Sequence, residues 1–303
     1  MIHPHTRTVR SFWAAGLALA SCVAACDVFD AKLYKNKPGA GADMSMQETG
    51  GDGGPGVIVD MAPIDPDAGG FLCGRTTPTT LCPASYLFCD GFETESGMSF
   101  TNWNNAPIIQ GAGVGLNAGT DLVIANSPTC LGQSSMHAKT VGANQQAFVF
   151  EQLAAPVPTT LHVRFFFYMT QYSMTPFQIV GFHASQDLNG NDYATLNVDP
   201  INGTLNYAGG FFGQAANFSG AQLPTNQWLC LELATTFDAH NGSVTVSLQG
   251  KQLGQLSGSP TDPMTEQLDQ VNVGIIYTNT GDTGTNDVYF DEVAISGQPI
   301  GCL

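Results

Sequence analysis

An alternation of apolar and polar side chains with a period of two is the sequence feature that most constrains the fold. It runs through His162–Thr170, Trp228–Asp238 and Ser243–Gln249, and near the end Tyr289, Asp291, Val293 and Ile295 share one parity. A period of two is typical of a β-strand that is packed on one face. Hairpin signals such as Asn241-Gly242 separate the runs, and no 12-residue stretch keeps a helical period. The pattern predicts an all-β fold, an antiparallel two-sheet sandwich or jelly roll.

The charge balance excludes one large class of partner. Nine Lys and Arg residues stand against 25 Asp and Glu residues, which gives a formal net charge of −16. A chain this acidic lacks the basic surface that binds phosphate backbones, so the sequence predicts no nucleic-acid partner. Aromatic residues make up 10% of the chain, more than an acidic disordered protein contains. The composition indicates a globular protein with a polar, mostly uncharged surface.

Residues 1–25 have the features of an export signal. Arg7 and Arg10 precede a short apolar run, Phe12–Leu19, which is too short to remain as a membrane span. The tetrapeptides that end at Cys22 and Cys26 both resemble the bacterial lipobox, whose cysteine is acylated after cleavage of the signal. Leu19 favours Cys22, whereas a longer apolar run favours Cys26; the alternative is an ordinary secretory signal. We expect an exported lipoprotein of the bacterial cell envelope, anchored to a membrane by its N-terminal lipid.

A tether and one folded domain follow the signal. Residues 26–71 are rich in Gly, Pro and Asp, including Gly50–Gly56, and contain too few large apolar residues to form a core. This stretch is predicted to be a disordered spacer. Residues 72–303 form the predicted domain, a size that suits a single β-sandwich. From residue 71 onward four basic residues stand against 17 acidic residues, a formal charge of −13.

The cysteines of the predicted domain indicate disulfide bonds. An even number of cysteines in an exported domain favours disulfides, and no pair has the CxxC spacing of a zinc site. Six cysteines allow 15 connectivities, so the sequence alone leaves the pairing open. The six are Cys73, Cys82, Cys89, Cys130, Cys230 and Cys302.

Four motifs, taken in their order along the chain, resemble a known family. They are Cys89–Glu93, Gly132–His137, Trp228–Glu232 with the following Asn241–Val246, and the closing Asp287–Ser296. This order is similar to the laminin G-like, concanavalin A-like lectin and glucanase jelly rolls, in the versions carried by bacterial, myxobacterial-type surface lipoproteins. The resemblance covers roughly residues 86–298. It implies two curved sheets of six or seven strands each, with a concave face that commonly receives glycans.

The resemblance also implies a cation site. Its first and last strands are neighbours, which would bring Asp90 and Glu93 near Asp291. Because Asp291 shares the parity of apolar residues, a structural calcium ion is one way to satisfy it. The alternative is that Asp90 and Asp291 accept backbone hydrogen bonds at a sheet edge. We also predict a disulfide between Cys130 and Cys230, because both lie beside predicted strands, and one between Cys302 and either Cys89 or Cys82, because the chain ends should meet across the first and last strands.

A catalytic alternative rests on four polar residues. Polysaccharide lyases on this fold need a base, a group that neutralises the uronate carboxylate, and an acid. Arg164, Tyr168, His183 and Tyr193 are the candidates for such a pocket. The carboxylate set of the related glucanases and the strings typical of alginate lyases are absent, and an acidic domain repels polyanionic uronates.

The sequence therefore favours a binding protein over an enzyme. We expect the jelly roll to bind a carbohydrate or another surface ligand without catalysis, and the acidity favours neutral glycans. A polysaccharide lyase or glycosidase is the first alternative, and a purely structural or adhesive surface domain is the second. The aromatic candidates for contact with sugar rings are Tyr168, Tyr193, Tyr207 and Phe212.

Overall fold

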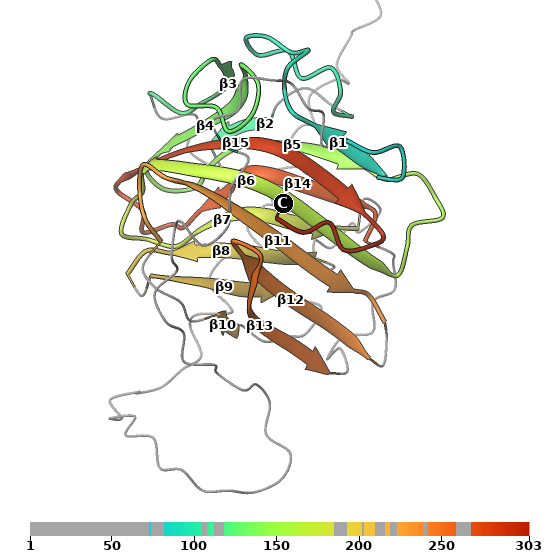
Figure 1. Cartoon of the computed structure of the whole chain (residues 1–303). Coiled ribbons are helices and arrows are strands. Elements are labelled where there is room, and N and C mark those ends of the chain that lie inside the picture. The colour runs from blue at the N-terminus through green and yellow to red at the C-terminus, as the bar shows by residue number, and fades with distance from the viewer. Residues whose placement is uncertain are drawn as a thin grey trace, which may run out of the picture. The chain divides into compact units, whose positions relative to one another are not determined.

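The chain folds into two antiparallel β-sheets, shown as two layers in the computed structural model of Figure 1. The structure describes residues 73, 82–104, 108–111, 118–184, 193–201, 203–209, 216–218, 223–238, 241–258 and 268–302. The predicted signal peptide, the tether and both lipobox cysteines lie outside these residues. Within the described part of the chain, no helix is long and apolar enough to cross a membrane.

The first sheet has eight strands, and the last strand of the chain lies inside it. Its hydrogen-bonded order is β13-β12-β11-β6-β15-β4-β3, and β1 pairs with β15. The first and last strands are therefore neighbours, as the family resemblance implies (Figure 1). The bounds are β1 Phe88–Asp90, β3 Asp121–Ala125, β4 Ser135–Val141, β6 Thr160–Gln171, β11 Trp228–Thr236, β12 Gly242–Leu248, β13 Lys251–Gly258 and β15 Thr285–Ser296.

The second sheet has seven strands in the order β10-β9-β8-β7-β14-β5-β2. All of its neighbouring strands are antiparallel. The bounds are β2 Ile108–Gly111, β5 Gln145–Gln152, β7 Phe177–His183, β8 Tyr193–Asp199, β9 Thr204–Gly209, β10 Ala216–Phe218 and β14 Gln270–Thr278. The predicted all-β, two-sheet jelly-roll class is confirmed.

The core lies between the two sheets and is built from one parity of most strands. On β6 the residues Phe165 and Phe167 face inward, and on β8 Leu196 does the same; all three are fully buried. Burial of such side chains stabilises the fold by about 1.5–3 kcal/mol each. The other residues of the strands face outward, and the polar residues that could bind a ligand lie on these two outer faces.

A β-bulge in β15 changes which way the final acidic residues point. The pairing with β6 shifts register between Asp291 and Ala294, and Glu292 has a left-handed φ of 50°. Phe290 and Val293 both face the core, although they differ in parity. The inference that Asp291 points inward with Val293 is therefore wrong, because Asp291 turns to the outer face beside Phe166.

The six cysteines form three disulfides, but not with the predicted partners. The observed pairs are Cys73–Cys130, Cys82–Cys89 and Cys230–Cys302. Both predicted pairings, Cys130–Cys230 and Cys302 with Cys89 or Cys82, are wrong. Cys130 and Cys230 do lie in one buried cluster, together with Leu131 and Phe166. Cys130 is bonded to Cys73, near the start of the domain, and Cys230 is bonded to Cys302, near its end. The cluster therefore attaches both ends of the domain to the eight-stranded sheet.

Candidate functional site

The outer face of the seven-stranded sheet carries a row of neutral polar side chains. On β8 the residues Thr195 and Asn197 lie opposite the core-facing parity of Leu196. Asn197 is paired in register with Asn206 on β9. Across the other neighbour, Thr195 is paired with Gly181, which in turn is paired with Asn272 on β14. Three strands, β9, β8 and β14, thus place amides and a hydroxyl on one face, and Gly181 of β7 lies between Thr195 and Asn272.

These polar side chains are shielded from solvent although they face away from the core. The exposed fraction is 0% for Thr195, 3% for Asn272 and 9% for Asn197 and Asn206. Asparagine and threonine on an outer sheet face are usually exposed. Burial of polar groups that point outward means that neighbouring atoms cover them, and buried polar groups of fixed geometry are typical of ligand sites.

Hydrogen bonds hold the amides in fixed orientations. Asn197 Nδ2 donates to Asn206 Oδ1 at 2.7 Å, and Gln270 Nε2 donates to Asn272 Oδ1 at 2.7 Å. Two buried acceptors on the face, Asn197 Oδ1 and Thr204 Oγ1, have no hydrogen-bond partner among the described residues. A buried oxygen that lacks a donor costs about 1–3 kcal/mol, which a ligand hydroxyl that donates to it would offset.

Gly181 is a buried glycine at the centre of this face, with three side chains close to its Cα. A Cβ atom built on Gly181 would lie 3.0 Å from Thr195 Cγ2, 3.2 Å from His183 Nε2 and 3.4 Å from Ile276 Cδ1. The side chains of these three residues therefore converge above the glycine: an imidazole, a methyl group and an aliphatic side chain. A larger residue at this position would have to displace them.

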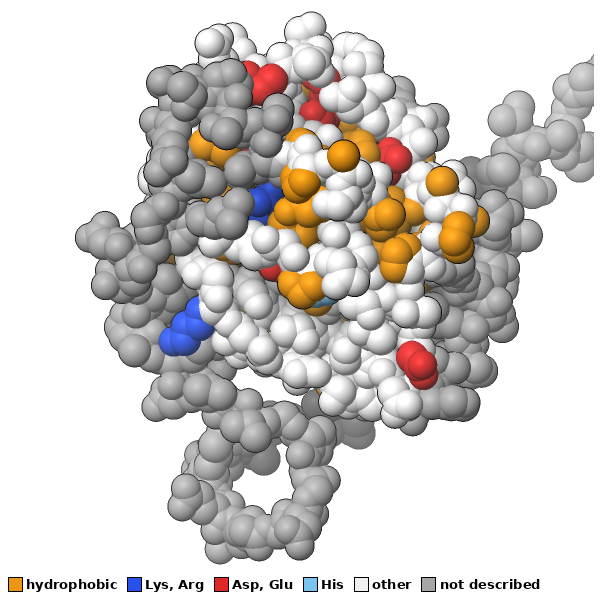
Figure 2. All heavy atoms as spheres, turned by 45° about the vertical axis from the view of Figure 1, so that its right-hand side comes forward, with side chains coloured by type: hydrophobic (Ala, Val, Ile, Leu, Met, Phe, Trp, Pro, Cys, Tyr) orange, Lys and Arg blue, Asp and Glu red, His pale blue; other side chains and the backbone are white. Residues whose placement is uncertain are grey.

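The face is nearly free of charge. Asp199, at the end of β8, is the acidic residue in register with Thr204, and its Oδ1 accepts a hydrogen bond from the Ile201 N–H at 3.1 Å. Figure 2, which draws one face of the molecule, shows hydrophobic side chains among uncharged atoms and few charged side chains. Such a surface suits a neutral ligand that has many hydroxyl groups.

The four lyase candidates do not come together in one pocket. Arg164 and Tyr168 belong to β6 of the eight-stranded sheet, whereas His183 and Tyr193 are opposite each other on β7 and β8 of the seven-stranded sheet. The sheets are separated by the core. Arg164 is fully buried, and burial lowers the pKa of its guanidinium despite the nearby Glu292.

The three predicted calcium ligands are occupied by hydrogen-bond donors. Asp90 accepts from the Phe92 N–H at 2.8 Å and from Trp103 Nε1 at 2.7 Å. Asp291 Oδ2 accepts from the Cys130 N–H at 2.8 Å. Glu93 accepts from the Gln133 and Ser134 N–H groups, both at 2.9 Å.

This arrangement matches the alternative in which Asp90 and Asp291 bind backbone groups. Within the described residues, no three His, Cys, Asp or Glu side chains lie close enough together to hold a metal ion. Asp90, Glu93 and Asp291 therefore do not fit a calcium ion as a ligand set. Burial raises the pKa of both Asp90 and Asp291, and the backbone hydrogen bonds to Phe92 and Cys130 oppose that rise.

The four aromatic residues predicted to contact sugar rings do not form one site among the described residues. Tyr207 is fully buried in the core, so its predicted contact with sugar rings is wrong. Tyr168 lies on the outer face of the eight-stranded sheet. Phe212 and the side chain of Tyr193 lie outside the described residues. Sequence reasoning missed the amides of β8, β9 and β14, whose only signal was their polar parity.

Comparison with known proteins shows a fold and no family. No protein-family model and no curated protein matches the sequence. Among solved structures, "Cellulose induced protein, Cip1" aligns over 71% of this chain and 100% of its own length, with a TM-score of 0.52 and 18% identity.

Two further structures align less well. Domain 4 of AbnA, a GH43 extracellular arabinanase from Geobacillus stearothermophilus in complex with arabinotriose, covers 71% of this chain and 96% of its own, with a TM-score of 0.40 and 14% identity. Alginate lyase AlyC3 covers 54% of this chain and 74% of its own, with a TM-score of 0.39 and 11% identity. The likeness to Cip1 shows that the chain has a jelly-roll fold of the concanavalin-like kind.

Proposed function

We propose that this protein binds a neutral carbohydrate, without catalysis, on the outer face of the seven-stranded sheet. The observation that carries the proposal is the buried, uncharged row of Thr195, Asn197, Asn206 and Asn272 on strands β8, β9 and β14. The buried acceptors Asn197 Oδ1 and Thr204 Oγ1 supply places for sugar hydroxyls to donate.

The chemistry of the face matches a sugar better than other small ligands. Amide side chains both donate and accept, as sugar hydroxyls do. Ile276, which lies beside Thr195 at Gly181, adds an apolar side chain to the amides of the row. The acidic domain disfavours polyanionic chains by long-range repulsion. A neutral glycan is therefore the ligand class.

Binding without turnover is favoured by the separation of the lyase candidates on two sheets. His183 on the seven-stranded face has neither Arg164 nor Tyr168 beside it, so an acid, a base and a neutralising cation are not assembled there. The surface context is export, which the three disulfides support because such bonds persist in oxidising compartments. Lipid attachment at Cys22 or Cys26 completes the proposal, and mass spectrometry of the mature N-terminus tests it.

A glycan array that includes neutral and uronic-acid oligosaccharides tests the binding function. We expect signals on neutral glycans that are weakened about tenfold or more by Asn197→Ala. Gln255→Ala, an exposed change on β13 of the other sheet, serves as the matched control and should leave the array pattern unchanged. New ultraviolet absorbance on incubation with polyuronates would overturn the non-catalytic function, and a blank array would favour an adhesive surface domain.

A further inference from the structure

A row of four rings crosses the outer face of the eight-stranded sheet. The register pairs His137 on β4 with Tyr289 on β15, Tyr289 with Tyr168 on β6, and Tyr168 with Trp228 on β11. We call these four residues the aromatic row. Four successive strands each contribute one ring at the same level, so the row runs perpendicular to the strands.

Neighbouring rings of the aromatic row are in contact. The centroids of His137 and Tyr289 lie 4.2 Å apart with nearly parallel planes, those of Tyr289 and Tyr168 lie 6.2 Å apart edge to face, and those of Tyr168 and Trp228 lie 5.4 Å apart. All four side chains are partly exposed, unlike the buried Phe290 on the core face. Ring contacts of this kind fix the geometry of the strip before any ligand arrives.

The aromatic row lies beside a part of the same face that is covered. Phe166 and Cys230, on the same two strands as Tyr168 and Trp228, are fully buried beneath Cys130 and Leu131. Trp228 packs against that buried cluster at its edge. The disulfide-bonded segments therefore cover the part of the outer face next to the row, whereas the row itself stays partly accessible.

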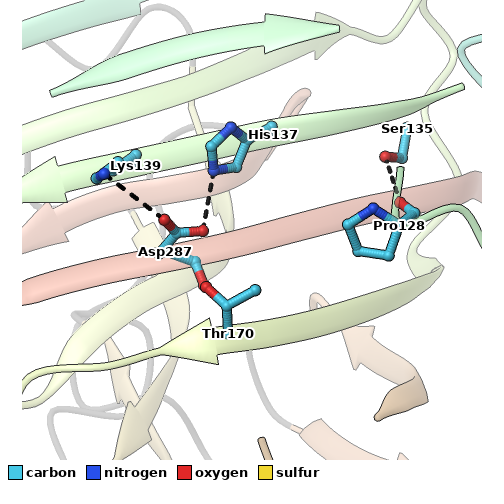
Figure 3. Close-up of polar contacts among 6 residues, drawn as sticks. All are labelled: Pro128, Ser135, His137, Lys139, Thr170 and Asp287. Atoms are coloured by element: carbon cyan, nitrogen blue, oxygen red, sulfur yellow. Dashed lines mark hydrogen bonds and ion pairs between the residues drawn. The ribbon is translucent and has the colours of Figure 1, made fainter. Parts of the chain in front are cut away.

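Polar groups flank the row and balance one another in charge. His137 Nε2 lies 2.9 Å from Asp287 Oδ1, and Lys139 Nζ lies 3.8 Å from Asp287 Oδ2, as Figure 3 shows. Thr170 Oγ1 donates to the Asp287 carbonyl oxygen at 3.4 Å. Nearer the Trp228 end of the row, the Tyr168 hydroxyl donates to Asn226 Oδ1 at 3.5 Å. The row thus has an apolar centre with hydrogen-bonding groups along its edge.

We propose that the aromatic row is a second carbohydrate site, which binds a neutral polysaccharide chain laid across strands β4, β15, β6 and β11. The C–H face of a sugar ring is apolar and weakly positive, which complements the negative face of an aromatic ring. A polysaccharide repeats its rings along one direction, as the aromatic row does. Flanking hydroxyl, amide and charged groups then receive the hydroxyls at the sugar's edge.

A protein partner fits the aromatic row less well. Stable protein interfaces bury about 800 Å² on each partner and need breadth as well as length. The row is one ring wide, and the buried cluster around Phe166 and Cys230 lies along one side of it. A thin, linear ligand uses this shape fully, whereas a protein surface would leave most of its area without contact.

This second site goes beyond the function proposed above because it lies on the opposite sheet. The core separates the two outer faces, so one sugar chain cannot contact both. A protein with both sites would bridge two chains, and bridging gives avidity and cross-linking that a single site cannot give.

Affinity electrophoresis through gels that contain hydroxyethyl cellulose, a neutral glucan, tests the second site. We expect retardation of the full chain to fall about tenfold in Tyr289→Ala and in Trp228→Ala. Tyr289→Phe keeps the ring and should be retarded as the unaltered protein is. Gln255→Ala on β13 of the same sheet is the control for general surface effects. Circular dichroism melts identify any variant that fails to fold.

The two proposals fail separately in this design. Loss of retardation in Asn197→Ala, with full retardation in Tyr289→Ala and Tyr168→Ala, overturns the second site and leaves the seven-stranded face as the only one that binds the glucan. Loss in the row variants with full retardation of Asn197→Ala supports the second site alone. If the unaltered protein passes unretarded, or if the row variants change only self-association, the second site is wrong. Quenching of Trp228 fluorescence by cellohexaose, absent in Trp228→Phe, is the expected direct signal.

Discussion

The Nδ1 atom of His162 on β6 lies 2.8 Å from Oε1 of Glu232 on β11. The same carboxylate accepts hydrogen bonds from the Ile300 N–H at 3.0 Å and the Gly301 N–H at 2.8 Å. One buried side chain therefore connects two central strands with the end of the domain. The disulfide Cys230–Cys302 fastens the same end, so a covalent and a hydrogen-bonded link act together.

Replacement of Glu232 should loosen this end of the domain. Glu232→Ala leaves two buried N–H groups without acceptors and should lower the free energy of unfolding by about 2–4 kcal/mol at neutral pH. Burial raises the pKa of Glu232, but hydrogen bonds from His162, Ile300 and Gly301 outweigh it, and the net pKa is lowered. This stabilisation is present above the ordinary pKa of 4.5 and is lost as the pH falls through the folded-state value.

Urea unfolding at pH 7 and at pH 3 measures this loss. Glu232→Ala and the unaltered protein should differ most at pH 7 and converge at pH 3. A difference that is equal at both values would mean that packing, not the ionised carboxylate, holds the domain end.

The two disulfides that close loops of unlike length should contribute unequally. Cys230–Cys302 spans 72 residues of sequence, whereas Cys82–Cys89 spans 7. The chain-entropy relation gives roughly 4 kcal/mol for the long loop and roughly 2 kcal/mol for the short one. The double variants Cys230→Ser with Cys302→Ser, and Cys82→Ser with Cys89→Ser, compared by urea unfolding, check the order. Equal losses would contradict the entropic account.

Glu292 should make the domain less stable as the pH rises. Burial raises its pKa to about 7; Arg164 opposes the rise, whereas Glu93 and Asp90 add to it. Because the folded state keeps a proton that the unfolded chain releases above pH 4.5, the free energy of unfolding falls between about pH 4.5 and pH 7. Glu292→Gln removes this dependence, which is worth roughly 3 kcal/mol at most.

Unfolding curves at pH 5 and pH 8 check this prediction. From pH 5 to pH 8, the free energy of unfolding of Glu292→Gln should rise relative to that of the unaltered protein. Parallel pH profiles for both proteins would show that Glu292 is ionised throughout.

Replacement of Gly181 should weaken glycan binding to the seven-stranded sheet. Gly181→Ala places a methyl group 3.0–3.4 Å from Thr195, His183 and Ile276, so these side chains must shift. We expect calorimetric affinity for the best neutral glycan on the array to fall about tenfold, with stability changed by less than about 1–3 kcal/mol. Gln255→Ala is again the control. Unchanged affinity would place the glycan elsewhere than above Gly181.

Removal of calcium should leave the domain intact. The oxygens of Asp90, Glu93 and Asp291 are held by N–H donors, and the described residues contain no three-ligand metal group. We expect the same melting midpoint with and without a calcium chelator. A midpoint that falls by several degrees with the chelator would support the calcium site that the family resemblance implies.

The sequence by itself determined the class of fold, because strand periodicity is local. The alternation in His162–Thr170 survives as β6, with Phe165 and Phe167 inside, since a strand must turn successive side chains to opposite faces. The sequence also predicted that the six cysteines of the domain form disulfides, and they do.

Only the tertiary structure decided which distant residues meet. The bulge at Glu292 reversed the direction expected for Asp291, because one extra residue flips every side chain that follows. Strand order put Arg164 and His183 on different sheets, and strand register aligned His137, Tyr289, Tyr168 and Trp228 in one row. Order and register depend on packing across the whole core, and no local pattern encodes them.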